Sequence, residues 1–247
     1  MAQIRKPRPL RHTRKRANQR AAISTIVALS DLHGWLPPTI PACDLLIIAG
    51  DLCPDGLEQY EWLDGPFREW LNAVPARHVV ATWGNHDFCA HYGRIPARLR
   101  CTFLVDQSIE IEGLLVHGTP WTTPFSRWAF SEDEDVLEGC FSRIPDKVDI
   151  LVAHSPPYGW HDRKVADEHR GSRALLAAIE QKRPRLVVCG HVHLARGGSD
   201  APWGRIECVP SLDERRHPHT PAFLTLRWKP PRAKTRPARS QARSRRS

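Results

Sequence analysis

Five apolar runs in this chain each end directly in residue types that commonly bind metal ions. The runs are short and rich in Val, Ile and Leu, which is typical of buried strands, and helical patterns lie between several of them. In α/β chains of this kind, functional side chains gather where strands exit into loops. The five exits, in chain order, are Ser30-Asp31-Leu32-His33-Gly34, Gly50-Asp51, Gly84-Asn85-His86-Asp87, His154 and Gly190-His191-Val192-His193.

The alternation of strands and helices predicts a mixed α/β layered fold. Strands are expected at 21–30, 44–50, 77–84, 148–155, 184–191, 205–211 and 222–228, with three short strands within 101–119. Helices are expected at 57–74, broken near Gly65-Pro66, and at 131–144 and 172–183, with Ser131 and Ser172 as N-caps. No break in composition divides the middle of the chain, so we expect a single domain at 21–228.

Charge is distributed unevenly along the 247 residues, whose formal net charge is +9. Residues 1–20 and 229–247 are rich in Arg and Lys and hold no acidic residue, whereas the part between them is acidic overall. Such segments cannot bury apolar area, so we expect two disordered basic tails. They could bind polyanions weakly and non-specifically, or act only as solubilising tails.

The expected location is the cytoplasm, and no membrane partner is expected. The basic start has no apolar segment after it of the kind found in secretory signals, and no run of about 18 apolar residues occurs. An organellar transit peptide is the alternative interpretation of the basic start. The seven cysteines include no C-x-x-C pair, which favours reduced thiols over a disulfide framework or a zinc knuckle.

The strand exits predict a metal centre with carboxylate, imidazole and amide ligands. Asp31 and His33 are two residues apart, as are His191 and His193, so each pair points to one side of an extended segment. A ligand set without thiolate suits catalytic Mn, Fe, Co, Ni or Zn better than structural zinc. Each exit alone could be an ordinary turn or cap. Seven residues are candidate ligands: Asp31, His33, Asp51, Asn85, His154, His191 and His193. Seven ligands are too many for one ion that also binds substrate, which favours two ions with one bridging carboxylate.

These exits, in this order, resemble the signature of the calcineurin-like metallophosphoesterases. The resemblance covers about 23–228 and implies a two-sheet β-sandwich flanked by helices, with a dinuclear site at the strand ends. It implies that one ion is held by Asp31, His33, Asp51 and His193. The second ion would be held by Asp51, Asn85, His154 and His191, with Asp51 as the bridge.

The resemblance also assigns roles beside the metals. His86 would lie near the leaving-group oxygen without binding metal, and Asp87 would orient His86. A narrower similarity, carried by GTPWTTPFSRWAF (118–130) and HSPPYGWHD (154–162), is to small phosphodiesterases related to class III cyclic-nucleotide phosphodiesterases and to animal metallophosphoesterase-domain proteins. That group commonly has Gly-His-Gly-Asp where this chain has Gly159-Trp160-His161-Asp162, so the substrate preference stays open.

The predicted function is therefore hydrolysis of small or nucleotide-like phosphodiesters by a hydroxide that bridges two metal ions. The alternatives are a phosphatase for proteins or small monoesters, a nuclease, or a metal-poor scaffold that only binds partners. Asn85 and His86 are expected to contact substrate, and Trp121, Trp128 or Trp160 to stack on it from bordering loops. His217 and His219 lie outside the five exits and are interpreted as loop residues; the oligomeric state is left open.

Overall fold

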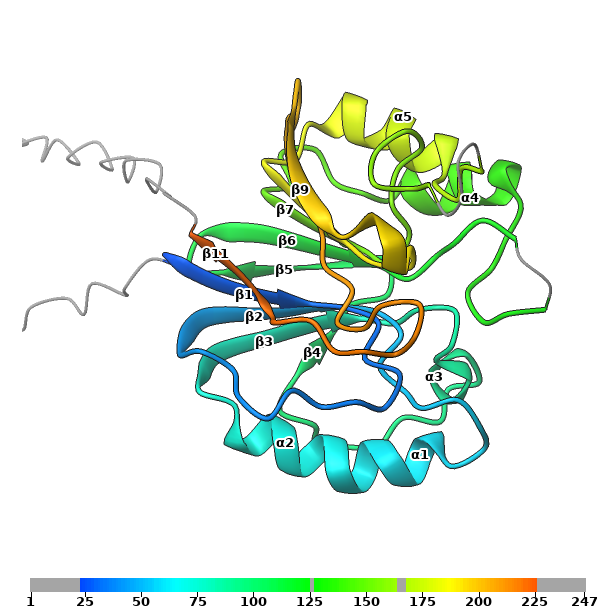
Figure 1. The fold of residues 1–247 in the computed structure, drawn as a ribbon. Helices are drawn as coiled ribbons and strands as arrows, with labels where there is room; N and C mark the ends of the chain where they lie inside the picture. Colours follow the sequence, from blue (N-terminus) through cyan, green and yellow to red (C-terminus); the bar gives the residue numbers. More distant parts are fainter. Residues whose placement is uncertain (1–22, 125–126, 164–167, 226–247) are drawn as a thin grey trace, which may run out of the picture.

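The computed structural model describes residues 23–124, 127–163 and 168–225 (Figure 1). The predicted tails at 1–20 and 229–247 lie outside these described residues, as do the outer limits expected for the domain. Among the described residues, no helix combines the length and the apolar content that a membrane crossing requires.

One sheet contains the first three exits. Its strand order is β11-β1-β2-β3-β4, with β11 antiparallel to β1 and the other neighbours parallel. The strands are β1 (Thr25–Leu29), β2 (Cys43–Ala49), β3 (Ala76–Thr82), β4 (Thr102–Phe103) and β11 (Ala222–Thr225).

The second sheet contains the other two exits. Its order is β5-β6-β7-β8-β10-β9, with parallel strands in the middle and an antiparallel strand at each edge. The strands are β5 (Gln107–Ile111), β6 (Leu114–Thr119), β7 (Ile150–Ala153), β8 (Leu186–Cys189), β9 (Gly197–Ala201) and β10 (Gly204–Cys208).

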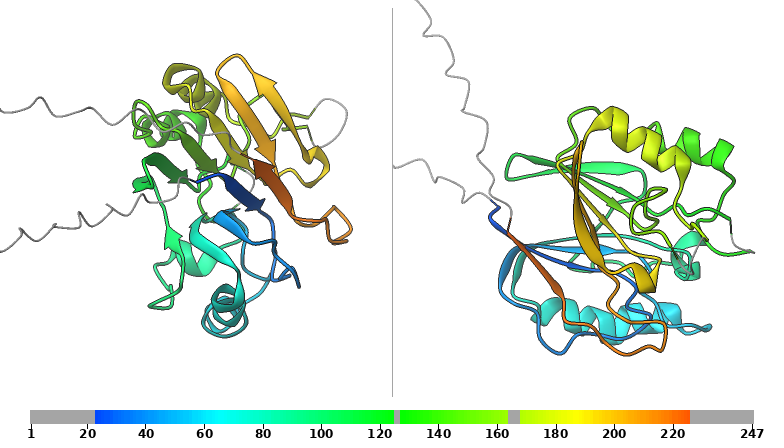
Figure 2. Two further views of the ribbon diagram at one scale, coloured as in Figure 1. Left: turned by 90° about the vertical axis from the view of Figure 1, so that its left-hand side faces the viewer. Right: turned by 45° about the horizontal axis from the view of Figure 1, so that its top comes forward.

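The sheets pack face to face, and helices cover their outer faces (Figures 1 and 2). Strand β2 shows why, because Leu45 and Ile47 face the core between the sheets while Leu46 and Ile48 face the core under the helices. A strand buried on both faces needs a continuous apolar run.

The helices lie on the two outer sides of the sandwich. On one side are α1 (Gln59–Trp62), η1 (Leu63–Phe67), α2 (Arg68–Ala73) and α3 (Phe88–His91), and on the other are α4 (Glu134–Phe141) and α5 (Arg173–Lys182). A short 3₁₀ turn, η2, lies at His193–Ala195. The predicted two-sheet sandwich is confirmed.

Two expected helix features were wrong. The helix predicted to break near Gly65-Pro66 continues through a π-helical turn, η1, that contains Pro66. A wider turn can accommodate a proline, which lacks the N–H that a regular α-helix needs. Helix α4 begins at Glu134 after Asp133, so Ser131 is not its N-cap.

Ser172 is the N-cap of α5, as predicted, and it also joins two helices. Its hydroxyl accepts a hydrogen bond from the Leu175 amide at 3.0 Å and donates one to Glu134 Oε2 at 2.9 Å. Replacing Ser172 by alanine should lower the free energy of unfolding by about 1 kcal/mol or slightly more. Urea unfolding would measure this, with Ser142→Ala as control, because that exposed hydroxyl bonds to Gly139 O in its own helix. Equal losses in both variants would contradict the bridging role.

Candidate metal centre

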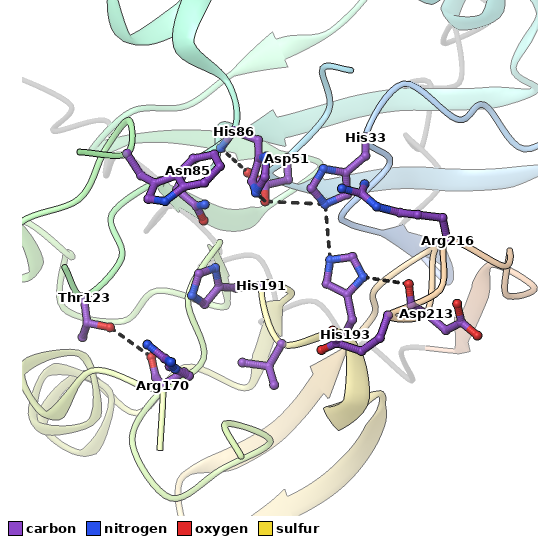
Figure 3. A pocket seen from close by; sticks show the side chains of 13 residues that line it. His33, Asp51, Asn85, His86, Thr123, Arg170, His191, His193, Asp213 and Arg216 are labelled. Carbon is purple, nitrogen blue, oxygen red and sulfur yellow. Dashed lines mark hydrogen bonds and ion pairs between the residues drawn. The ribbon is translucent and has the colours of Figure 1, made fainter. Parts of the chain in front are cut away.

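The five strand exits meet at one edge of the sandwich. Strands β1, β2 and β3 end there from one sheet, and β7 and β8 end there from the other. Direct backbone bonds join the sheets at this point, from the Ser30 amide to Val209 O at 3.0 Å and from the Ser211 amide to Ser30 O at 2.8 Å. The structure brings together all seven residues predicted as metal ligands, five of which are labelled in Figure 3: His33, Asp51, Asn85, His191 and His193.

Four of these seven residues have a left-handed backbone. The φ angles are 52° at Asp31, 44° at His33, 52° at Asp51 and 70° at His191. Non-glycine residues avoid this region, and where they occupy it they cluster at functional sites. The backbone therefore turns sharply just past β1, β2 and β8 and directs these side chains toward one another.

The first group of donor atoms lies around His33 and His193. Their Nε2 atoms are 3.2 Å apart. His193 Nε2 lies 3.5 Å from Asp31 Oδ1, and His33 Nε2 lies 3.8 Å from Asp51 Oδ2. Ligand atoms bound to one ion at about 2.1 Å are separated by about 3 to 3.5 Å. These spacings suit a shared cation.

The second group lies around His154. Its Nε2 is 3.3 Å from Asp51 Oδ2 and 3.1 Å from Asn85 Oδ1. The His191 ring packs edge-on against the His154 ring, with the centroids 5.2 Å apart. The same oxygen, Asp51 Oδ2, thus belongs to both groups. The other oxygen of that carboxylate accepts the His86 amide at 2.7 Å.

Backbone carbonyls orient two of the imidazoles. His154 Nδ1 lies 2.8 Å from Ala49 O, and His193 Nδ1 lies 3.3 Å from Asp213 O. A carbonyl oxygen can only accept, so in each ring Nδ1 is the donor and Nε2 faces the centre. Metal-binding histidines usually have this arrangement, because it fixes both the tautomer and the ring direction.

The buried carboxylates and imidazoles of the site suit the binding of cations. Asp31 and Asp51 are 0% and 2% exposed. Burial lowers the pKa of His33 to about 4 and that of His191 to about 3, so both rings are neutral and can offer a lone pair. Burial opposes charge on His154 too, yet the Asp51 carboxylate raises its pKa to about 10. A divalent cation would replace that proton, and the buried carboxylates and neutral imidazoles fit it.

Glycines let the backbone approach these side chains. A Cβ on Gly84 would lie 2.3 Å from Asp51 Oδ1, and one on Gly190 would lie 2.3 Å from Asp31 Oδ2. Both distances are far inside van der Waals contact. Two exits therefore need glycine beside a ligand because the neighbouring carboxylate occupies the space.

Replacing Gly84 by alanine should consequently displace Asp51 and lower the metal content of the purified protein. The overpacking should also lower the free energy of unfolding by about 1–3 kcal/mol. Elemental analysis and urea unfolding would measure the two effects.

The matched control is Gly139→Ala on the exposed face of α4, where a Cβ meets nothing within 4 Å. This change should leave the metal content unaltered and stabilise the helix by about 0.5–1 kcal/mol. If Gly84→Ala kept a full metal content, the close packing of Gly84 against Asp51 would not be required for metal binding.

His86 has a different partner from the one predicted. Its Nδ1 lies 2.8 Å from Asp55 Oδ1, and its Nε2 lies 4.0 Å from Asp51 Oδ2. Asp87 does not orient the ring, because its buried carboxylate accepts three backbone amides: those of Leu52 at 2.9 Å, Cys53 at 2.8 Å and Gly84 at 2.8 Å. Asp87 instead holds the loops after β2 and β3 together.

Of the three tryptophans expected to border the site, Trp128 is the one beside it. Trp128 packs on His86 with the ring centroids 4.2 Å apart and lines the cavity. Trp121 donates to Asp106 Oδ2 at 2.9 Å, and Trp160 packs edge-on against Trp203 at 6.0 Å. Trp121 and Trp160 are not among the residues that line the cavity, whereas Trp128 is.

A cavity of about 260 Å³ opens over the donor atoms (Figure 3). Beyond the metal-ligand types and Trp128, its walls include Thr123, Arg170, Asp213 and Arg216. Sequence reasoning missed both arginines and Asp55. Only the spacing of Asp55, four residues after Asp51 in the same exit loop, could have drawn attention to it.

A model of the calcineurin-like phosphoesterase family matches residues 24–195. The chain belongs to this family. The predicted resemblance to the calcineurin-like metallophosphoesterases is thereby confirmed, and the members of this family use divalent metal ions.

Two relatives of this family member agree with the predicted similarity to animal metallophosphoesterase-domain proteins. Metallophosphoesterase domain-containing protein 1 of Homo sapiens is 30% identical over 204 residues, which cover 69% of this chain and 61% of the human protein. UPF0046 protein C25E10.12 of Caenorhabditis elegans is 29% identical over 199 residues, 69% of each chain. The crystal structure of TT1561 of Thermus thermophilus aligns with a TM-score of 0.55 at 18% identity, covering 76% of this chain and 89% of that one. This last match shows the shared fold.

Proposed function

We propose that this chain is a phosphodiesterase that uses two metal ions and acts on small or nucleotide-like phosphodiesters. The observation that carries the proposal is the position of Asp51 Oδ2, which lies within 3.8 Å of His33 Nε2 and within 3.3 Å of His154 Nε2. One oxygen shared by two groups of donors is the arrangement that a bridging ligand requires.

The ligand assignment follows the two groups. Asp31, His33, Asp51 and His193 would hold one ion. Asp51, Asn85, His154 and His191 would hold the other. Mn, Fe, Zn, Co and Ni all suit this mixture of carboxylate, imidazole and amide. When bound, such cations lower the pKa of water and neutralise charge on phosphoryl oxygens.

His86 would act on the leaving group. Asp55 holds its Nδ1, so the ring presents Nε2 to the centre of the site. As the bond from phosphorus to the departing oxygen breaks and the water oxygen bonds to phosphorus, His86 can donate a proton to that departing oxygen. The products are a phosphomonoester and an alcohol. Asn85, 6% exposed at the cavity floor, would also contact the phosphoryl group.

The shape of the cavity favours a diester. It extends from the donor atoms past His86 to Trp128 and Thr123, which leaves room for an organic group beside the phosphate. A metal-poor scaffold is disfavoured, because all seven candidate ligands are present and lie together. A phosphatase for monoesters and a nuclease are the remaining candidates, and a substrate panel separates them.

The test combines metal analysis with substrate comparison. Protein loaded with Mn²⁺ should hold about two ions per chain and should hydrolyse bis-p-nitrophenyl phosphate with a higher kcat/KM than p-nitrophenyl phosphate. Cyclic nucleotides, glycerophosphodiesters, phosphoproteins and a DNA oligonucleotide complete the panel, and cleavage of the oligonucleotide in preference to the small diesters would indicate a nuclease. A clear preference for monoesters or phosphoproteins would replace the diesterase with a phosphatase. Absence of both metal and turnover would favour the scaffold.

A further inference from the structure

Arg216 reaches the cavity from a loop outside the family signature. The loop, residues 211–219, follows β10, and Arg196 helps to fix its start by donating to Pro210 O at 2.7 Å. Asp213 organises the loop from within, because its Oδ1 accepts the amides of Arg215 and His217, each at 2.8 Å. Arg216 itself has φ 63°, a conformation that non-glycine residues adopt rarely.

This loop places a guanidinium beside the proposed leaving-group residue. Arg216 Nη2 lies 2.9 Å from Asp55 Oδ2, while Asp55 Oδ1 lies 2.8 Å from His86 Nδ1. One carboxylate therefore connects Arg216 to His86, and Arg216 is 161 residues from Asp55 in the sequence. Figure 3 shows Arg216 extending from the side of Asp213 toward His33.

Arg216 is able to exchange its partner for a ligand. The side chains of Arg216 and Asp55 are 45% and 59% exposed, and exposed ion pairs of this kind contribute little stability. A guanidinium has five N–H donors in a planar fork, which suits a carboxylate or a phosphate. Asp213 does not compete for the fork, because its carboxylate is bound by the loop amides and by His217 Nδ1 at 3.1 Å.

We infer that Arg216 selects phosphodiesters whose leaving group carries an additional anionic group, a carboxylate or a phosphate. The inference rests on the proposed function, since His86 marks the side on which the leaving group departs. An alcohol leaving past His86 passes beside Arg216, and the guanidinium can pair with a negative charge on it. Glu214 lines the same cavity, and its negative charge repels an anionic leaving group. Selection is therefore restricted to leaving groups whose charge reaches Arg216.

A pair of chromogenic diesters tests the inference. Methyl p-nitrophenyl phosphate is compared with the same diester bearing a carboxylate next to the nitro group, so that only the leaving group gains charge. The wild-type protein should prefer the carboxylated diester, measured as the ratio of the two kcat/KM values. Arg216→Ala should reduce that ratio about tenfold, Arg216→Lys should retain part of it, and Arg216→Glu should reverse it.

Arg215→Ala is the matched control. Arg215 is the adjacent exposed arginine of the same loop and does not line the cavity, so the ratio should stay at the wild-type value. The inference is overturned if the wild type shows no preference, or if Arg215→Ala and Arg216→Ala change the ratio equally.

Calorimetry separates this inference from the proposed function. Binding of the two free phenols is measured on the wild type and on Arg216→Ala, without turnover. Tighter binding of the carboxylated phenol to the wild type, lost in Arg216→Ala, supports Arg216 as the anion-binding group. If the wild type hydrolyses neither diester, the proposed function fails, and calorimetry alone decides on Arg216. Equal binding of both phenols by the wild type overturns the inference.

Discussion

Asp51→Asn is expected to lower kcat for a small diester by about three orders of magnitude and to reduce the content of both metal ions. The physical reason is that Asp51 Oδ2 belongs to both groups of donor atoms, so its charge acts on two ions. An amide oxygen is neutral and a weaker ligand. A loss of several kcal/mol in electrostatic stabilisation corresponds to a rate change of that order.

Metal content and kcat must be measured on the same preparation of Asp51→Asn. Asp146→Asn is the matched control, because this carboxylate is 84% exposed and pairs with Lys182 at a helix end. The control should keep both ions and full activity. Two retained ions with intact turnover in Asp51→Asn would remove Asp51 from the bridging position.

His86→Ala should separate binding from chemistry. His86 lies 4.0 Å from the shared Asp51 oxygen and is paired with Asp55, outside both groups of donor atoms. Its loss should therefore leave the metal content near that of the wild type. The rate on a diester with an alkyl leaving group should fall about 10²–10⁴-fold, the usual contribution of a general acid. A p-nitrophenyl leaving group scarcely needs a proton, so that rate should fall much less.

The measurement is kcat for the two substrates together with elemental analysis of His86→Ala. Equal rate losses on both substrates, accompanied by lost metal, would make His86 a metal ligand. Asp55→Asn extends the comparison, because weakening the contact to Nδ1 should affect the alkyl substrate in the same direction and by a smaller factor.

The clustering of the candidate ligand residues within each sheet was predictable, because a simple rule connects them. Parallel strands buried on both faces appear as continuous apolar runs, and the carboxyl ends of such strands share one edge. The exits of one sheet, such as those that end in Asp31 and Asp51, therefore had to lie along one edge. The two-sheet arrangement followed from the family signature rather than from periodicity, because apolar runs do not specify which strands pair.

Other features depend on contacts between distant segments, which a pattern does not contain. The family resemblance implied that Asp87 orients His86, yet backbone amides from another loop occupy the Asp87 carboxylate. Arg216 approaches Asp55 only because the loop after β10 folds over the site. The π-turn at Pro66 and the glycine-containing edge strand β9 have no strong signal in the local sequence. Their conformations depend on packing against the rest of the domain.

The two groups of donor atoms contain residues that follow strands of both sheets of the sandwich. Asp51 extends from one sheet, whereas His154 and His191 extend from the other, with the bridge at Ser30 and Pro210 as the nearby backbone link. Cations bound here would fasten the two halves together, and the unfolded chain would lack the site. By mass action, the resistance of the whole domain to unfolding would then follow the free metal concentration around it. A centre proposed for hydrolysis would thus also determine how stable the folded domain is where metal is scarce.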